Sequence, residues 1–379
     1  MIKPVQDILK RAESRAPAMA FMSIALAFGA WVTRLPEVKE NLGLSEGELG
    51  TALFFIPLGA VTLLPFYSRI IQRLGERKST LIALTSFLIL IVIVGQIPSK
   101  ASLMAGLYLL GLTMGLTDVA MNAVVSEVEK QESRSIMSSC HGFFSIGGMF
   151  GALLASMFIW LGGSLFIQSV VITLVLLTLV YFHQQYLLNS NDSQPSPGFQ
   201  WPRKEVFILA MIGFCIMMCE GGIVDWSTIY LKESLEMSAQ YAGLGFGGFS
   251  LFMALARFKG DELTTRFGLN VLIRSGMLVG VLGLALTLLG NPYLAIIGFS
   301  ISGLGLSVIV PTLFSSSTRV EGVSAAKGIA SVASAGYIGL LVGPVVIGFV
   351  AERFGLGNGF LFLLGLVVLA LLLSIKRNS

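Results

Sequence analysis

Twelve stretches of about 20 mostly apolar residues follow one another along the chain and are separated by short polar turns. An α-helix of this length spans the hydrocarbon core of a bilayer, and it satisfies its own backbone hydrogen bonds there. The sequence therefore predicts an all-α membrane protein with twelve transmembrane helices. These are expected to start near Pro17, Gly50, Ser79, Ser102, Ser135, Ser164, Val206, Gly243, Val271, Pro292, Ala325 and Gly359.

The composition supports this fold class. Charged residues make up 12% of the chain and hydrophobic residues 55%, whereas a soluble domain has about 25% charged residues. The spans and turns use nearly all of the 379 residues, so no separate soluble domain is expected. The first residues mix basic and acidic side chains and lack a small-residue cleavage site, which predicts a short surface helix rather than a signal peptide.

Basic residues are distributed unevenly between alternate turns. Only Arg34, Lys39, Lys100, Lys232 and Arg353 fall in one set of turns, and the other 20 of the 25 Lys and Arg residues fall in the opposite set or at the two ends. Cytoplasmic loops are the ones rich in Lys and Arg. Both termini are therefore expected to be cytoplasmic, in a multi-pass protein that contacts the lipid bilayer. No basic stripe carries interleaved aromatic residues, so no nucleic-acid partner is expected.

The residues that enzymes and metal sites need are scarce. The chain has two histidines and lacks a Gly-rich phosphate loop, which argues against a membrane-embedded enzyme and against ATP-driven transport. Cys140, Cys215 and Cys219 all fall inside spans, and this odd set suits small core residues better than disulfides or a metal site. We expect neither a metal nor a cofactor.

The chain divides into two similar halves. A polar segment, Asn189 to Gly198, separates the sixth and seventh spans and is typical of a linker. With a shift of 193 positions, "KENLGLSEGELG" from Lys39 overlies "KESLEMSAQYAG" from Lys232, and Gly75 overlies Gly268. This repeat predicts two pseudo-symmetric six-helix bundles, 1–188 and 204–379, joined by a cytoplasmic linker, 189–203. Repeats of this kind are typical of secondary transporters.

This arrangement resembles the major facilitator superfamily over essentially the whole chain. Like that family, the chain has a basic turn containing glycine after the second span and an echo of it after the eighth. The resemblance implies the major facilitator fold and a conformational gate at these turns, formed by Arg73, Gly75, Arg77, Lys78, Arg266 and Gly268. The family usually has an Asp three residues before the glycine, where this chain has Gln72 and Thr265.

Ionisable residues inside the spans are the main functional candidates, because each charge at the bilayer centre costs at least about 2.5 kcal/mol. Asp118 lies in the fourth span, and Glu220 and Asp225 lie in the seventh. We predict that these three carboxyl groups couple transport to protons. Glu127 and Glu129 lie near the end of the fourth span, where they read as a solvated helix end.

Asp118 and Asn122 are four residues apart, so both lie on one face of the fourth helix. We expect Asn122 to bind the solute and Asp118 to take up a proton, since removal from water favours the neutral form of a carboxyl group. In the alternative interpretation, Asp118 pairs with His141 or with a serine of the fifth span and only holds helices together.

The segments "TDVAMNAVVSEV" and "CHGFFSIGGMFGALL" resemble the fourth and fifth spans of the fucose:proton symporter group and of its YbjJ-type inner-membrane relatives. In that group an acid four positions before an Asn is implicated in proton coupling, and Asp118 and Asn122 match these positions. The resemblance implies a bacterial inner-membrane location. The group's sugar-binding Asp of the first span has no counterpart here, where Trp31 and Val32 stand in that region.

The repeat places Asp225 at the position that matches Val32. We hypothesise that Arg34 and Asp225 form an ion pair near the outer mouth. In the alternative, Asp225 and Trp226 are interfacial anchors.

Glu220 precedes Gly221 and Gly222, and consecutive glycines often mark an unwound stretch that lines a cavity.

The remaining candidate solute contacts are polar or aromatic residues near these acids: Arg34, His141, Trp31, Trp226 and Thr312, the last beside Pro311. The favoured function is proton-coupled alternating-access transport of a small polar, sugar-like solute by a monomer. The alternatives are proton-coupled efflux of an amphipathic compound and, in another class, a membrane sensor that does not transport.

Overall fold

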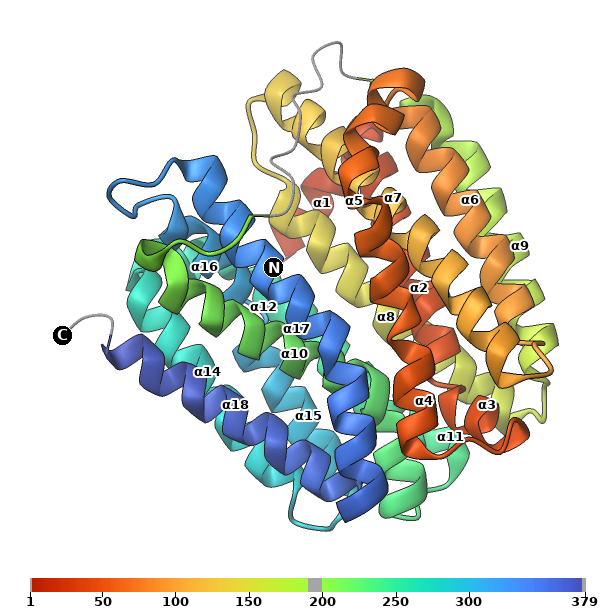
Figure 1. Ribbon diagram of the computed structural model, residues 1–379. Coiled ribbons are helices and arrows are strands. Elements are labelled where there is room, and N and C mark those ends of the chain that lie inside the picture. The colour runs from red at the N-terminus through yellow and green to blue at the C-terminus, as the bar shows by residue number, and fades with distance from the viewer. Residues whose placement is uncertain (1, 190–199, 377–379) are drawn as a thin grey trace. The chain divides into compact units, whose positions relative to one another are not determined.

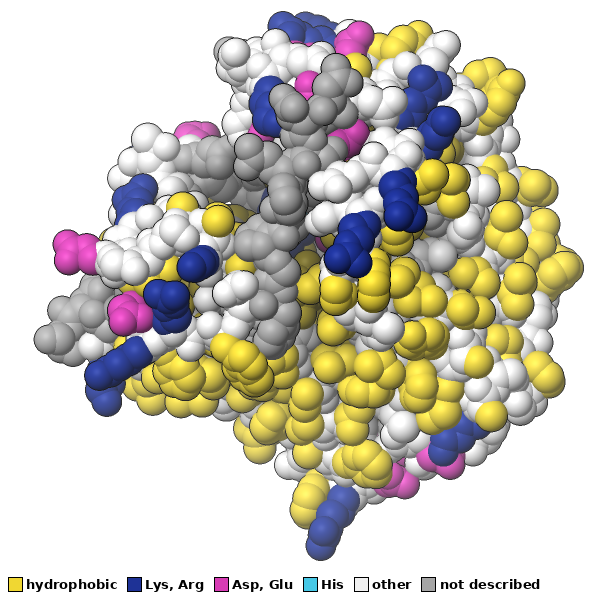
Figure 2. All heavy atoms as spheres, turned by 45° about the horizontal axis from the view of Figure 1, so that its top comes forward, with side chains coloured by type: hydrophobic (Ala, Val, Ile, Leu, Met, Phe, Trp, Pro, Cys, Tyr) yellow, Lys and Arg dark blue, Asp and Glu magenta, His cyan; other side chains and the backbone are white. Residues whose placement is uncertain are grey.

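The computed structural model describes residues 2–189 and 200–376, and all regular elements in these ranges are helices (Figure 1). Within them, twelve stretches are long and apolar enough to cross a membrane, the first at Ala12–Val32 and the last at Leu356–Lys376. Large hydrophobic side chains such as Trp160, Leu282 and Leu372 are exposed, and Figure 2 shows such side chains over much of the visible surface. An apolar surface of this extent is suited to lipid. The predicted fold class is confirmed.

The helices form two compact units. Unit 1 comprises Met1–Arg34 and Phe55–Ser196, and unit 2 comprises Leu35–Phe54 and Pro197–Ser379. Residues 35–54 therefore group with unit 2, although the chain on both sides of them belongs to unit 1. Most of the predicted linker, 189–203, lies outside the described residues.

In unit 1, the N-terminal residues form a short helix, as predicted, and α2 packs on α8 and α9 while α7 packs on α5 and α6. The polar residues Ser99 and Ser164 cap the first turns of α7 and α9, so these helices begin where the sequence turns apolar. The helices of unit 1 are α1 (Ile2–Lys10), α2 (Ala12–Val32), α5 (Phe55–Leu74), α6 (Glu76–Val94), α7 (Lys100–Glu132), α8 (Met137–Trp160), α9 (Leu165–His183) and the 3₁₀ turn η1 (Gln184–Tyr186).

In unit 2, α10 packs on α17 and α18, α14 packs on α15 and α18, and α4 packs on α17. The helices are α3 (Leu35–Asn41), α4 (Glu46–Leu53), η2 (Lys204–Val206), α10 (Phe207–Ile229), the π-helical η3 (Tyr230–Ser234), α11 (Ala239–Ala242), α12 (Leu244–Arg257), α13 (Gly260–Phe267), α14 (Leu269–Thr287), α15 (Pro292–Leu306), α16 (Ile309–Ser317), α17 (Ala325–Phe354) and α18 (Leu356–Lys376). A cluster of Tyr230, Phe299 and Phe360 rings fills part of the core.

Glycines allow the closest helix contacts in both units. A Cβ atom on Gly151 of α8 would collide with the backbone carbonyl of Leu26 on α2, and one on Gly339 of α17 would collide with that of Phe214 on α10. Small residues let transmembrane helices approach in this way, where van der Waals packing replaces the hydrophobic effect as the main attraction.

Candidate functional site

Asp118 and Asn122 lie one turn apart on α7, and both are partly buried. The Asn122 side-chain amide donates to the Asp118 backbone carbonyl at 2.7 Å and to the Asp118 carboxylate at 3.2 Å. The alternative in which Asp118 pairs with His141 or with a serine of the fifth span stays a hypothesis.

His141 lies in the first turns of α8 and contacts an aromatic ring of α2. Its ring meets that of Phe21 edge-on, with the centroids 5.0 Å apart and the planes at 72°. This contact ties the start of α8 to α2 inside unit 1. A role of His141 in solute binding stays a prediction.

Arg34 is 5% exposed and is held inside unit 1. Its Nε donates to the side-chain oxygen of Gln168 on α9 at 2.8 Å, and its Nη2 donates to the carbonyl of Gly163 at 2.6 Å. Gln168 in turn donates to the carbonyl of Ala30 at 3.1 Å. Arg34 and Asp225 belong to different units, so their pairing stays a hypothesis.

Trp31 and Trp226 are both almost fully buried, at 1% and 0% exposure. Trp31 stacks on Phe28, with the ring centroids 6.1 Å apart. Neither indole N–H has a hydrogen-bond partner in the part of the chain that the structure describes, although a buried Trp N–H usually finds one. The burial of Trp226 argues against its role as a headgroup-depth anchor, and a solute-binding role of Trp31 and Trp226 stays a prediction.

Glu220 and Asp225 lie on α10, and both are partly buried. One Glu220 carboxylate oxygen has no hydrogen-bond partner, and neither residue forms a salt bridge within the described part of the chain. The expected unwinding at Gly221 and Gly222 is wrong, because α10 continues through both residues. The two glycines accommodate neighbouring side chains of α17 and α18 instead.

Arg257, the last residue of α12, was not among the predicted site residues. It lies within electrostatic range of Glu220. The sequence "ARFKGDEL" places Arg257 at a polar boundary, where it reads as a loop residue. The one sequence signal for its position is the length of the eighth span, which needs Arg257 to complete its last turn.

Thr312 and the hydroxyl-bearing residues of α10 differ in how they are bonded. The buried Thr312 hydroxyl donates to the carbonyl of Val308 at 2.5 Å, so it retains only acceptor capacity for a solute. Ser227 and Thr228, which follow Trp226 on α10, are buried, and their hydroxyl groups have no hydrogen-bond partner among the described residues. These two residues were not among the predicted solute contacts.

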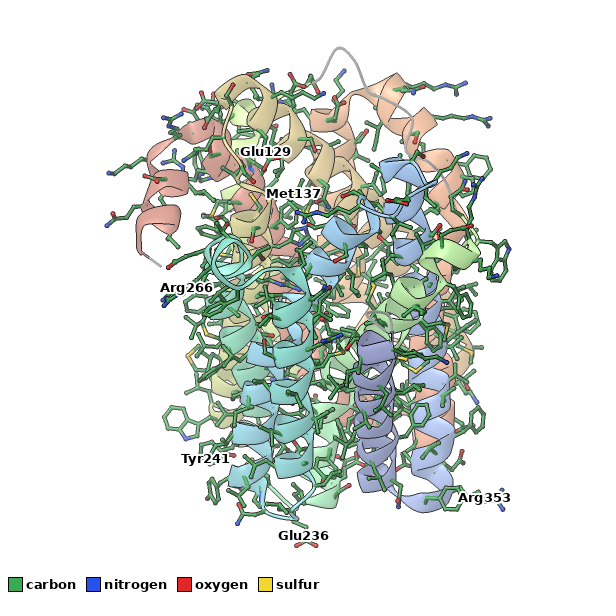
Figure 3. All side chains as sticks on the ribbon, turned by 90° about the vertical axis from the view of Figure 1, so that its left-hand side faces the viewer. Glu129, Met137, Glu236, Tyr241, Arg266 and Arg353 are labelled. Carbon is green, nitrogen blue, oxygen red and sulfur yellow. The ribbon has the colours of Figure 1, made fainter. Side chains whose placement is uncertain are left out.

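The predicted gate turns share one backbone conformation. Gly75 and Gly268 have φ of +81° and +79°, and Gly355, which ends α17, has +85°. Arg266 stacks on the ring of Phe267 at 5.2 Å, and the Arg77 amide N–H is bonded by the side chain of Asn189 at 2.9 Å. Figure 3 labels Arg266 near the α13 turn. Arg73 and Lys78 are exposed, and a gating role for all six turn residues stays a prediction.

Glu129 was predicted to lie at a solvated helix end, but its carboxylate has a structural role. Its carboxylate accepts hydrogen bonds from the backbone N–H groups of Ile136 and Met137 at 2.6 and 2.8 Å, so it caps the start of α8 (Figure 3). A carboxylate at a helix N-terminus also interacts favourably with the helix dipole.

No cluster of three or more potential metal ligands occurs among the described residues.

The profile of the Major Facilitator Superfamily matches this chain at residues 18–322 and again at 209–378. The chain belongs to the Major Facilitator Superfamily. It is therefore a membrane transporter and not an enzyme.

Individual proteins agree with this assignment. An uncharacterized MFS-type transporter of Yersinia pestis is 31% identical over 356 residues, covering 93% of this facilitator and 92% of that protein. The uncharacterized transporter y4wD of Sinorhizobium fredii is 31% identical over 345 residues, covering 89% and 91%. Among solved structures, a point mutant of the nucleoside transporter NupG superposes with a TM-score of 0.78 at 14% identity, covering 97% of this chain and 100% of that one, which shows a shared fold.

Proposed function

We propose that this facilitator couples the movement of a small polar, sugar-like solute to protons. The observation that carries the proposal is that Asp118, Glu220 and Asp225 all lie in membrane-spanning helices and form no salt bridge with any residue that the structure describes. An ionised carboxylate without a directly bonded cation is costly at this depth, and binding a proton removes that cost.

Asp118 is the proposed primary proton site, because its carboxylate is bonded by the neutral amide of Asn122. The Asn122 amide can stay bonded to Asp118 while its carbonyl oxygen accepts a bond from a solute hydroxyl. Protonation of Asp118 would turn an acceptor into a donor beside Asn122, and this change links solute binding to the proton. Glu220 and Asp225 are the proposed assisting groups in unit 2.

The proposed solute contacts are groups that can still form a hydrogen bond with a ligand. The indole N–H groups of Trp31 and Trp226 are unpaired among the described residues, and His141 and Thr312 add further polar atoms. The donors of Arg34 are engaged by Gln168 and Gly163, which favours a supporting role for Arg34. A set of neutral donors and acceptors suits a hydroxyl-rich solute.

We also propose a subgroup, a membrane location and an oligomeric state for this transporter. The signatures around Asp118 and Gly147 support membership of the fucose:proton symporter group or its YbjJ-type relatives. The uneven distribution of basic turns supports an inner-membrane location with cytoplasmic termini. We further propose that the transporter acts as a monomer through alternating access.

Transport in vesicles tests the proposal. A thermal-shift panel of sugars, polyols and amphipathic drugs on the purified protein first selects a binding compound. Liposomes containing the protein then receive that compound with and without an imposed pH gradient. The parent protein should accumulate it only with the gradient, and Asp118→Asn should bind it without accumulating it. Glu127→Gln, at the end of the same helix, is the matched control and should behave like the parent.

Two outcomes would contradict the proposal. Full accumulation by Asp118→Asn would remove the proton role from this residue. Binding of amphipathic drugs alone, with accumulation in the opposite vesicle orientation, would favour efflux over uptake.

A further inference from the structure

Two ion pairs join α3 to the segment that follows α10. The Lys39 ammonium contacts the Glu233 carboxylate at 2.5 Å, and the Lys232 ammonium contacts the Glu40 carboxylate at 3.0 Å. Lys39 also contacts Glu46, at the start of α4, at 3.0 Å. All these residues belong to unit 2, near the end of the helices that carries the Glu236 turn labelled in Figure 3.

The two pairs are related by the internal repeat. The shift of 193 positions that aligns the halves places Lys39 on Lys232 and Glu40 on Glu233. Each lysine therefore binds the glutamate of the other copy. Reciprocal pairing of this kind is what an approximate twofold axis produces, since residue i contacts residue j and the equivalent of j contacts the equivalent of i.

The two pairs differ in their exposure to water. The Lys39 side chain is 12% exposed and that of Glu233 is 29% exposed, whereas the Glu40 side chain is 75% exposed. Burial alone would lower the pKa of Lys39, but the hydrogen bonds and charges of Glu233 and Glu46 raise that pKa above its ordinary value. The Lys39 pair is therefore the stronger one, because exposed pairs contribute little.

The paired segment is fastened to unit 2 but is continuous with unit 1 at both of its ends. Residues 35–54 group with unit 2, and the chain returns to unit 1 at Phe55. A second attachment lies on α4, where a Cβ atom on Gly50 would collide with the backbone carbonyl of Pro344 on α17. The ion pairs thus act on a segment of unit 2 whose two ends both continue into unit 1.

We propose that the reciprocal pairs Lys39–Glu233 and Glu40–Lys232 form a latch that keeps residues 35–54 on unit 2 in one state of the transport cycle. On the proposed orientation the latch lies at the non-cytoplasmic end, and release of residues 35–54 from unit 2 requires both pairs to separate. Protons and solute do not enter this argument, so the latch is independent of the coupling proposed above.

Distance measurements between spin labels test the latch in the full-length protein, reconstituted in nanodiscs without solute. The buried native cysteines are first replaced by Ala. One label pair, Asn41→Cys with Tyr293→Cys, reports segment 35–54 against unit 2. A second pair, Asn41→Cys with Gln96→Cys, reports it against unit 1. All three label positions are exposed.

Lys39→Met should raise the fraction of long Asn41–Tyr293 distances by about fivefold, the upper end for a surface ion pair, and Lys232→Met by less than about twofold. Combining Lys232→Glu with Glu40→Lys re-forms this pair with its charges exchanged, so the Asn41–Tyr293 distances should return to the distribution of the parent protein. Lys130→Met, at a Lys–Glu pair on α7, is the matched control and should change neither distance.

The latch is overturned if Lys39→Met combined with Lys232→Met leaves the Asn41–Tyr293 distances unchanged. A change confined to the Asn41–Gln96 distances would also overturn the latch. That result would mean that residues 35–54 stay attached to unit 2 and that the chain bends at Arg34 and Phe54 instead.

Discussion

The side-chain amide of Asn122 donates to the carboxylate of Asp118 at 3.2 Å, one helical turn away on α7. The bond keeps a potential proton acceptor and a potential solute ligand together on one rigid element. Because both groups sit on the same helix, their spacing does not depend on how other helices move. This is a suitable geometry for linking the occupancy of one group to that of the other.

The first prediction concerns Asn122. Asn122→Leu keeps the side-chain size but removes the amide, so the compound selected by the thermal-shift panel should bind at least about tenfold more weakly, a loss of about 1.4 kcal/mol. Binding is measured by titration of the purified protein. Ser126→Ala, one turn further along α7, should bind like the parent. Parent-like affinity of Asn122→Leu would exclude Asn122 as a solute contact.

The second prediction distinguishes a structural role of Arg34, through its hydrogen bond to Gln168, from a role in transport through an ion pair with Asp225. Gln168→Leu removes an acceptor from a buried guanidinium and should lower the free energy of unfolding by about 1–3 kcal/mol. Thermal unfolding in detergent measures the loss. If Arg34 works mainly through an ion pair with Asp225, then Gln168→Leu should retain transport, and exchanging Arg34 and Asp225 should rescue what each single replacement loses. Failure of that exchange would contradict the ion pair.

The fold could be read from the sequence because span length is a local property. Each apolar run needs only its own residues to specify a membrane helix, and the repeat follows from comparing the halves. The Asp118–Asn122 bond was foreseeable for the same reason, since helical spacing alone brings the two side chains together.

Partners far apart in sequence could not be assigned in this way. Arg34 and Gln168 are 134 positions apart, and Lys39 and Glu233 are 194 positions apart. The repeat aligns Lys39 with Lys232 but does not reveal that each lysine binds the other copy's glutamate. Such pairings depend on how helices pack, which a single sequence does not encode in any short pattern.

The third prediction concerns the cap of α8. Glu129→Ala removes the acceptor for two backbone N–H groups and should lower the free energy of unfolding by about 0.5–2 kcal/mol. Glu129→Gln keeps an acceptor oxygen and should lose less. The comparison is made by thermal unfolding against Glu127→Ala, which removes only exposed contacts with Gln131 at 3.0 Å and Lys130 at 3.9 Å and caps no helix. Equal stability of the Glu129 and Glu127 variants would show that the cap contributes nothing.

The fourth prediction concerns the positive-φ turns. At a φ near +80° and a ψ near +160° an L-residue is strained, so Gly268→Ala should lower the free energy of unfolding by about 1–3 kcal/mol. A Cβ atom added at Gly268 would meet no other atom within 4 Å, so any loss reports the backbone and not a steric clash. Gly357→Ala, in a helix and with equal open space, is the matched control. Unchanged unfolding of Gly268→Ala would show that the turn relaxes.

The fifth prediction concerns Glu220 and Arg257, whose charges interact across α10 and α12. Arg257→Met leaves the Glu220 carboxylate without a nearby cation, so it should lower thermal stability by more than Glu220→Gln does. The double replacement should recover much of the stability lost in Arg257→Met, because neither charge is then left alone. Gradient-driven accumulation should stay low in the double variant if Glu220 carries a proton during transport. Recovery of both stability and accumulation would instead assign the pair a purely structural role, because the carboxyl group would then be dispensable for coupling.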